Sequence, residues 1–378
     1  MDPKILIVGC ESTGERFGAA LTNHLKGKAP DAVIRGIGGS RMEAAGVDLI
    51  YNVTELDSLG VFDNFKGGHI TKRLLSRVSQ EMDYQRPDIV VQVGLPSFNL
   101  KLLELAQCKD IPVVYYYTPF SWGDTRIKLE ELASFVRKVA GVTKNEVELL
   151  EKVSIDVEFV GHPILDVLPK PLDKITVRKG FELTEDDTVV ALLPGSREVD
   201  VRVRLPVMIK GMELVAKENP EIKIVVAGAL SSQELDLIQK SISKSNLDIQ
   251  VIEKTYDALN VADLAVVTCG TASLEAALYR IPFIAVDKPL MVSFLSAKRL
   301  GRKGYSSLPN AIMQQKIVPE LVQNDFNERL LAEMVIDLLN SSEKRKSMLS
   351  QFDKLRDELG EPGSLARTAD MILDILQK

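Results

Sequence analysis

The chain has 378 residues, of which 47 are Lys or Arg and 53 are Asp or Glu, so its formal charge is −6. This length favours two domains, and a chain of this size buries enough surface to need no disulfide or structural metal. The mild acidity argues against a bulk nucleic-acid-binding protein, and three widely separated cysteines exclude a disulfide scaffold and a cysteine-rich zinc site.

The first half of the chain alternates short apolar runs with helical patterns. The apolar runs, each ending at Gly or Pro, lie at residues 5–8, 33–37, 88–93, 112–117 and 157–160. This alternation is typical of βαβ units that build a parallel sheet. We therefore predict that residues 1–167 form a Rossmann-like domain.

A proline-bearing segment at residues 168–172 reads as a stiff linker, after which the alternation restarts. Strand-like runs follow at residues 189–193, 222–227, 249–252, 264–267 and 282–286. We predict a second Rossmann-like domain over residues 168–345, and a helical segment over 346–378 that packs back on the first domain. The expected fold class is α/β, with two parallel-sheet domains facing a central cleft.

One loop in the second half has the character of an anion site. Gly195, Ser196 and Arg197 follow a predicted strand and open a helix, where ligands of parallel sheets bind. Ser196 is expected to cap the helix while free N–H groups face the ligand, and Arg197 can donate two bonds to a phosphate. A plain helix cap is the alternative interpretation.

A second loop repeats this arrangement. Gly270, Thr271 and Ser273 form another strand-to-helix turn, and Glu275 lies about one turn into the helix, where it can accept bonds from sugar hydroxyls. This loop could also be a plain cap. Two such loops in one sheet favour a ligand that carries a diphosphate.

The first half has its own glycine cluster, Gly9, Gly14 and Gly18. The spacing is not Gly-x-Gly-x-x-Gly, and the chain has no P-loop motif, so neither a dinucleotide site nor a P-loop kinase is indicated. Cys10 lies in the same loop and reads either as a small packing residue or as a nucleophile, with packing favoured because no base is fixed beside it.

The three histidines, His24, His69 and His162, are too scattered to indicate a metal cluster. His162, at a strand end before the linker, reads as a hydrogen-bonded junction residue or as a ligand contact. Trp122, the only tryptophan, reads as partly buried core or as a stacking wall of the cleft.

Six short motifs occur along the chain, at residues 36–42, 96–100, 159–163, 192–197, 270–277 and 307–310. In this order, and over nearly the whole chain, they resemble the lipid-A-disaccharide synthase family. The resemblance implies a GT-B glycosyltransferase that joins a UDP-activated acylated glucosamine to a lipid-linked sugar. It also implies that Arg197, Glu275 and Asn310 belong to the UDP-sugar site. The UDP-sugar is a substrate, and neither a cofactor nor a metal is expected.

The chain departs from the family in its catalytic motifs. Where the family has Asp-x-Pro-Asp-Phe-Asn, both carboxylates are replaced, by Gly94 and Ser97, and position 94 is the one usually assigned to catalysis. For an inverting transfer, the carboxylates left as bases are Glu11, Glu15 and Asp124. Glu15 is the preferred candidate because it stands where the family motif has an acid.

Two alternatives to the transferase remain. The changes at Gly94 and Ser97 favour a UDP-sugar-binding protein that has lost its transfer chemistry. A UDP-GlcNAc 2-epimerase shares the architecture, but it ranks last because the loop at residues 269–271 lacks the Ser-Gly-Gly pattern.

The segment at residues 289–303 joins an apolar run to four cations, Lys298, Arg299, Arg302 and Lys303. It reads either as a helix lying on an anionic bilayer or as a core helix with a solvated end. No apolar run reaches the roughly 18 residues of a membrane span, and the first residues do not read as a secretory signal. We expect a cytoplasmic protein on the inner face of the membrane, with a UDP-sugar donor and a lipid-linked acceptor as partners.

Overall fold

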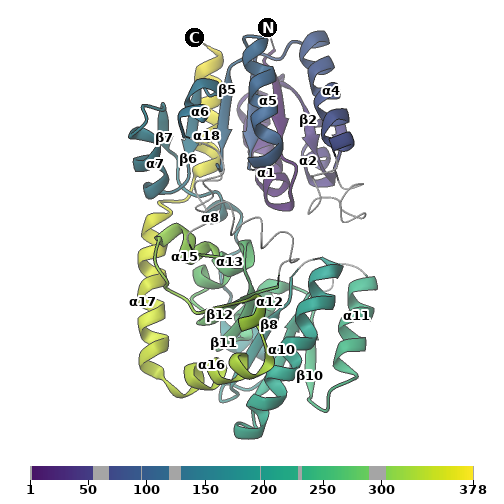
Figure 1. Ribbon diagram of the computed structural model, residues 1–378, viewed down its shortest axis with the longest axis vertical. Coiled ribbons are helices and arrows are strands. Elements are labelled where there is room, and N and C mark those ends of the chain that lie inside the picture. The colour runs from purple at the N-terminus through teal and green to yellow at the C-terminus, as the bar shows by residue number, and fades with distance from the viewer. Residues whose placement is uncertain are drawn as a thin grey trace. The chain divides into compact units, whose positions relative to one another are not determined.

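The computed structural model describes residues 2–53, 68–94, 96–118, 129–195, 197–228, 232–288 and 304–377 (Figure 1). The chain divides into two compact units. The first unit comprises Met1–Val167 together with Asp357–Lys378, and the second comprises Leu168–Arg356. The first unit therefore contains both the beginning and the end of the chain.

The first unit is built on a seven-stranded parallel sheet with the order β3-β2-β1-β4-β5-β6-β7. Its strands are β1 Lys4–Val8, β2 Val33–Gly38, β3 Asp48–Asn52, β4 Ile89–Val93, β5 Val113–Tyr116, β6 Lys138–Gly141 and β7 Val157–Phe159. The central strands β4 and β5 are buried along their whole length, which explains their nearly continuous apolar sequences.

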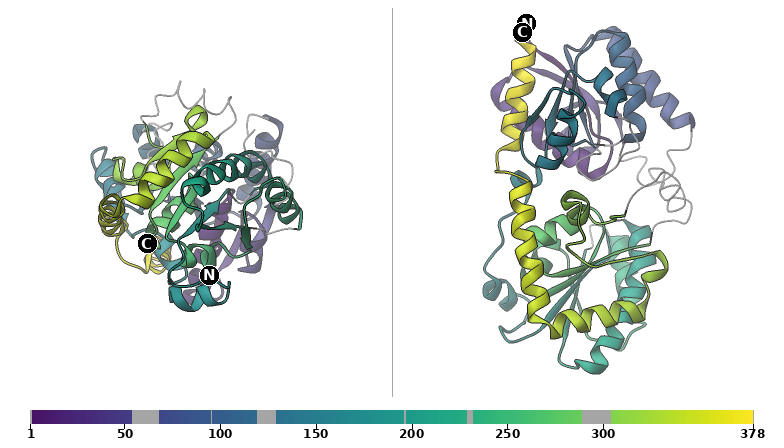
Figure 2. Two further views of the ribbon diagram at one scale, coloured as in Figure 1. Left: turned by 90° about the horizontal axis from the view of Figure 1, so that it is seen from below. Right: turned by 60° about the vertical axis from the view of Figure 1, so that its left-hand side comes forward.

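Helices cover both faces of this sheet (Figure 2). They are α1 Ser12–Lys28, α2 Ser40–Ala44, α4 Gly68–Tyr84, α5 Pro96–Cys108, α6 Leu129–Phe135, α7 Lys144–Glu151, α8 Ile164–Val167 and α18 Ser364–Leu376. The helices α4, α5 and α6 contribute leucine, valine and methionine side chains to one core. On the opposite face, α1 packs against the final helix α18.

The final helix is attached to the first unit through hydrogen bonds at its start. The carboxylate of Asp166 accepts bonds from the backbone N–H groups of Gly363, at 2.5 Å, and Leu365, at 2.8 Å. The buried hydroxyl of Ser364 donates to the carbonyl of Gly161 at 2.5 Å. The two bonds to Asp166 satisfy N–H groups that a helix leaves without intrahelical partners at its first turn.

The second unit has a six-stranded parallel sheet with the order β10-β9-β8-β11-β12-β13. Its strands are β8 Val189–Leu193, β9 Lys223–Ala227, β10 Ile249–Ile252, β11 Leu264–Thr268, β12 Phe283–Asp287 and β13 Glu320–Val322. Its helices are α9 Lys174–Lys179, α10 Glu198–Glu218, α11 Ser232–Ile242, α12 Thr255–Val261, α13 Thr271–Leu278, α15 Leu308–Met313, α16 Glu328–Asn340 and α17 Ser342–Glu358, with a short 3₁₀ helix at Gln323–Asp325. The predicted pair of parallel-sheet α/β domains is confirmed.

In both sheets, the strand order reverses beside the strand that comes first in the sequence. In the first unit this point lies between β1 and β4, and in the second between β8 and β11. Ligands of open parallel sheets bind just beyond the carboxyl ends of the strands at such a point. The loops that follow these four strands are therefore where a site is expected.

Candidate functional site

The loop after β8 is shaped by a glycine in the left-handed region. Gly195 has φ +119°, and a Cβ added there would lie 2.8 Å from the Cβ of Asp200. Helix α10 begins at Glu198, and Arg197 occupies its N-cap position with extended backbone and no capping bond from its side chain. The N-cap is thus one residue later than predicted, because Arg197 still has extended backbone angles; Ser196 lies outside the described residues.

Arg197 is the first member of a chain of ion pairs. Its Nε lies 2.9 Å from Oδ2 of Asp200, whose Oδ1 lies 2.5 Å from Nη1 of Arg204. Nη2 of Arg204 in turn lies 2.6 Å from Oδ1 of Asp287, at the end of β12. The Arg197 side chain is 43% exposed, so its guanidinium can also meet an anion at the mouth of the loop.

The loop after β11 contains a glycine, Gly270, and leaves the sheet next to the loop that follows β8. Gly270 has φ +117° and occupies the N-cap position of α13, and a Cβ added to it would meet no described atom within 4 Å. Val267 in β11 pairs with Leu193 in β8, so the two predicted loops leave neighbouring strands. Thr271 is the first residue of α13, and the buried Ser273 hydroxyl donates to the Gly270 carbonyl at 2.6 Å.

Glu275 is held by aromatic side chains. Only 7% of the residue is exposed, and its Oε1 accepts a 2.9 Å bond from the hydroxyl of Tyr256 in α12. The rings of Tyr256 and Tyr279 stack with their centroids 5.7 Å apart, and burial raises the pKa of Tyr279 to about 12. The carboxylate is therefore fixed in one orientation close to the second loop.

The Asn310 side chain is held by hydrogen bonds to the segment that leads into β13. Its Nδ2 donates to the Val318 carbonyl at 2.9 Å and to Glu320 at 2.8 Å. Its Oδ1 accepts from the N–H groups of Ile317 at 2.7 Å and Val318 at 2.9 Å. These bonds use both amide hydrogens and both lone pairs. Asn310 thus holds the turn between α15 and β13, and its contact with a UDP-sugar stays a prediction.

In the first unit, the glycine cluster allows close packing at the carboxyl ends of β1 and β4. A Cβ on Gly9 would lie 2.6 Å from the Gly14 carbonyl oxygen, and one on Gly14 would lie 3.0 Å from that of Val93. Gly94, with φ +67°, follows β4, and a Cβ there would lie 3.2 Å from Oε1 of Glu11. The Glu11 carboxylate therefore lies beside the position from which a side chain at residue 94 would project.

Glu15 has a different environment from Glu11. Its Oε1 accepts a 2.9 Å bond from the backbone N–H of Arg41, in the first turn of α2. This carboxylate satisfies a helix N-terminus, whereas that of Glu11 faces the turn at Gly94. The place beside Gly94 supports Glu11 as a candidate base, and Glu15, the preferred candidate from the sequence, stays a prediction. Asp124 and Trp122 lie outside the described residues.

A protein-family model described as lipid-A-disaccharide synthetase matches residues 5–370. The chain belongs to this family. The lipid-A-disaccharide synthase of Syntrophus aciditrophicus is 32% identical over 375 residues, which cover 99% of this chain and 98% of that protein. The family resemblance seen in the sequence motifs is therefore confirmed.

Solved structures show the same fold for this family member. UDP-GlcNAc 2-epimerase from Neisseria meningitidis, solved bound to UDP-GlcNAc, has a TM-score of 0.64 at 14% identity, with complete coverage of both chains. A glycosyltransferase from Rickettsia africae has a TM-score of 0.57 at 13% identity and covers 100% of this chain and 99% of that one. The predicted GT-B fold class is confirmed.

Two buried groups in this synthase-family chain are neutral packing residues. Burial and the nearby Glu11 raise the pKa of the Cys10 thiol to about 12, so Cys10 is unsuited to act as a nucleophile. Burial lowers the pKa of His162 to about 3, and its Nδ1 accepts a 3.0 Å bond from the Ile164 N–H. Its ring packs edge-on against Tyr117, which supports the hydrogen-bonded interpretation of His162.

Glu146 is a buried carboxyl that the sequence motifs did not single out. It lies in the first turn of α7 and is 1% exposed. It accepts hydrogen bonds from the Thr118 hydroxyl and, at 2.7 Å, from the Val142 N–H. Burial nevertheless raises its pKa to about 7. The Thr143-x-x-Glu146 spacing of a capping box could have revealed it, since Thr143 is the N-cap.

The raised pKa of Glu146 predicts a pH-dependent stability. Between about pH 4.5 and 7 the folded carboxyl binds a proton that the unfolded chain has released, so stability falls as the pH rises. Relative to Glu146→Gln, we expect the wild type to lose about 3 kcal/mol of unfolding free energy across this window. Urea unfolding at several pH values measures the difference, and parallel curves for the two proteins would contradict the prediction.

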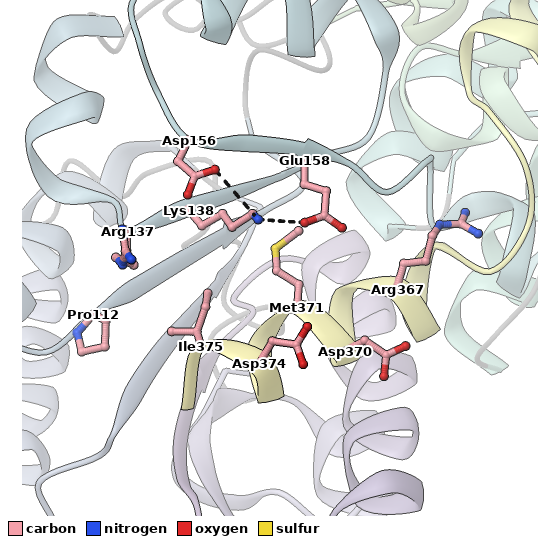
Figure 3. A pocket seen from close by; sticks show the side chains of 10 residues that line it. All are labelled: Pro112, Arg137, Lys138, Asp156, Glu158, Arg367, Asp370, Met371, Asp374 and Ile375. Atoms are coloured by element: carbon pink, nitrogen blue, oxygen red, sulfur yellow. Dashed lines mark ion pairs between the residues drawn. The ribbon is translucent and has the colours of Figure 1, made fainter. Parts of the chain in front are cut away.

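A pocket of 440 Å³ in the first unit lies away from these loops (Figure 3). It is lined by residues at the amino ends of β5 to β7 and on α18, including Pro112, Lys138 and Asp374. Lys138 is already paired with Glu158, at 2.8 Å, and its neighbours mix both signs of charge. Since parallel sheets bind ligands at their carboxyl ends, we assign the site to the loops and not to this pocket.

Within the described ranges, no group of three or more His, Cys, Asp or Glu side chains is arranged to hold a metal ion. Among the helices of the same ranges, none combines the length and the apolar character that crossing a bilayer requires.

Proposed function

We propose that the chain is a UDP-sugar glycosyltransferase that moves an acylated, N-acetylglucosamine-type sugar to a lipid-linked sugar acceptor. The family match over residues 5–370 and relatives named lipid-A-disaccharide synthase support a transferase over a binding protein without chemistry. The observation that carries the proposal is the pair of glycine loops, with Arg197 and Gly270, on the adjacent strands β8 and β11.

The second unit supplies the donor site in this proposal. Arg197 donates to the diphosphate, and the bare backbone at Gly270 lets the phosphates approach the N-terminus of α13. Glu275, fixed by Tyr256, accepts bonds from sugar hydroxyls of the donor. A UDP-sugar as donor agrees with the UDP-GlcNAc bound to the structurally similar Neisseria protein. The site uses no metal, because Arg197 and the helix N-terminus meet the diphosphate charge.

The first unit supplies the general base, for which the geometry favours Glu11. Its carboxylate takes the proton of the acceptor hydroxyl as that oxygen attacks C1 of the donor sugar. The bond between C1 and the diphosphate oxygen breaks, and its electron pair leaves with UDP, whose charge Arg197 stabilises. A single displacement of this kind inverts the configuration at C1.

The test is acceptor-dependent release of UDP. Purified protein is incubated with UDP-GlcNAc and with acylated UDP-glucosamine donors, each with and without a lipid extract containing glycolipid acceptors. We expect UDP release at enzymatic rates only when donor and acceptor are both present. Binding of the donor without release would instead support a binding protein, and conversion of UDP-GlcNAc to its 2-epimer would support an epimerase.

Contact with a membrane surface is part of the proposal, because the acceptor is lipid-linked. The cation-rich segment at residues 289–303 lies outside the described residues, and its sequence pattern supports this role. Vesicles with anionic lipid should sediment the wild-type chain but less of the Arg302→Glu, Lys303→Glu variant. Equal sedimentation of both proteins would contradict binding through this segment.

A further inference from the structure

Arg204 is a buried cation next to the donor loop that the proposed mechanism does not yet use. It lies in the second turn of α10 and is 8% exposed. Its guanidinium joins two carboxylates, Asp200 at 2.5 Å and Asp287 at 2.6 Å. Among the described residues, its Nε is a buried donor without a hydrogen-bond partner. Burying such a group is costly, which indicates that the guanidinium is held here for a reason other than stability.

Asp200 connects Arg204 to the donor loop. The Asp200 Cβ lies so close to Gly195 that only glycine fits there, and its carboxylate binds both Arg197 and Arg204. Without Arg204, the Asp200 carboxylate would have Arg197 as its only cationic partner in this chain of ion pairs and would hold it in place. With Arg204 present, the carboxylate remains compensated when Arg197 turns toward another anion.

We propose that Arg204 is a positioning residue of the donor site, which holds and neutralises Asp200 so that Arg197 can exchange its bond to Asp200 for the diphosphate. This inference rests on the proposed donor site. Under this proposal, Arg204 and Asp200 affect the binding of the diphosphate and not that of the nucleoside, which neither residue is required to contact. The two arginines and two aspartates of this chain of ion pairs balance one another in charge, so an Arg197 guanidinium that leaves Asp200 can compensate the charge of the diphosphate.

Removing Arg204 should therefore weaken UDP binding through Asp200. In Arg204→Met, Asp200 keeps Arg197 as its counter-ion, and we expect UDP affinity to fall roughly tenfold, the scale of one charge-assisted bond. In Asp200→Asn the competing carboxylate is gone, and UDP affinity should equal or exceed that of the wild type. In the double variant affinity should return to within about threefold of the wild type, because the carboxylate that captured Arg197 is absent.

The experiment is calorimetric titration of the full chain with UDP and, separately, with uridine. Uridine affinity should be the same in all variants, since uridine carries no phosphate. Arg202→Met is the matched control, because Arg202 lies on the same helix but is 63% exposed and paired with Glu198. Its UDP affinity should match that of the wild type. Thermal unfolding checks that each variant is folded.

Two results would overturn the role of Arg204: unchanged UDP affinity in Arg204→Met, or a loss that Asp200→Asn does not restore. If Arg204→Met does not fold, Asp200→Asn decides alone, and a tenfold loss of UDP affinity in that variant would contradict the inference. A wild-type chain that binds no UDP would overturn the proposed donor site itself, which distinguishes the two failures.

Discussion

Glu11→Gln is expected to lower the turnover number for sugar transfer at least about a hundredfold, the usual contribution of a general base. Glutamine keeps the size of the side chain but cannot accept the proton of the acceptor hydroxyl. UDP affinity should stay within threefold of the wild type, because Glu11 belongs to the first unit and the diphosphate loops to the second. Steady-state rates of UDP release and UDP titrations measure the two quantities.

Glu15→Gln is the matched control for this prediction. The Glu15 carboxylate holds the N–H of Arg41, so its loss should reduce stability modestly and leave most of the turnover. Turnover lost in Glu15→Gln but retained in Glu11→Gln would identify Glu15 as the base, as the sequence first suggested.

Placing an acid at residue 94, where the family resemblance implies one, tests for a gain of activity. The left-handed φ at Gly94 is one that Asp tolerates better than most residues, and its Cβ would lie 3.2 Å from Oε1 of Glu11. We therefore expect the double variant Glu11→Gln, Gly94→Asp to have a turnover number at least about tenfold higher than that of Glu11→Gln alone. No recovery in a folded double variant would show that a carboxylate at this place does not suffice.

Arg197→Ala and Glu275→Ala should each weaken UDP-sugar binding roughly tenfold or more, because each removes one charge-assisted contact. The effect of Arg197→Ala should persist with UDP alone, and that of Glu275→Ala should be largest for ligands that carry the sugar. Arg329→Ala is the control, because Arg329 in α16 is 84% exposed and is paired with Glu333 on the same helix. Unchanged affinity in both site variants would remove the donor-site assignment.

The strands with long apolar runs could be predicted from the sequence, and the less apolar ones could not. Residues 189–193 and 264–267 coincide closely with β8 and β11, because strands buried on both faces are almost wholly apolar. The strands β3, β6 and β13 were missed. Each is short or lies at or near a sheet edge, and β3 is half-buried with Asp and Asn at its ends, so its apolar run is brief.

For the site, the sequence predicted the loops but not how their side chains are used. The turns at Gly195 and Gly270 follow from glycine after a buried strand, and both glycines have positive φ. The sequence does not show that Arg197 forms an ion pair with Asp200, or that the Asn310 amide is fully hydrogen-bonded. Both depend on how the chain folds. Likewise, Glu11 and Glu15 are equivalent acids in sequence, and only the fold places one of them beside Gly94.

The most direct test of the proposed transferase is mass spectrometry of the lipid product. Wild-type protein is incubated with an acylated UDP-glucosamine donor and a glycolipid acceptor, and the lipids are extracted and fragmented. We predict a new glycolipid heavier than the acceptor by one acylated glucosamine residue, and its near absence with Glu11→Gln. Donor and acceptor recovered unchanged from wild-type protein that binds UDP would contradict the account.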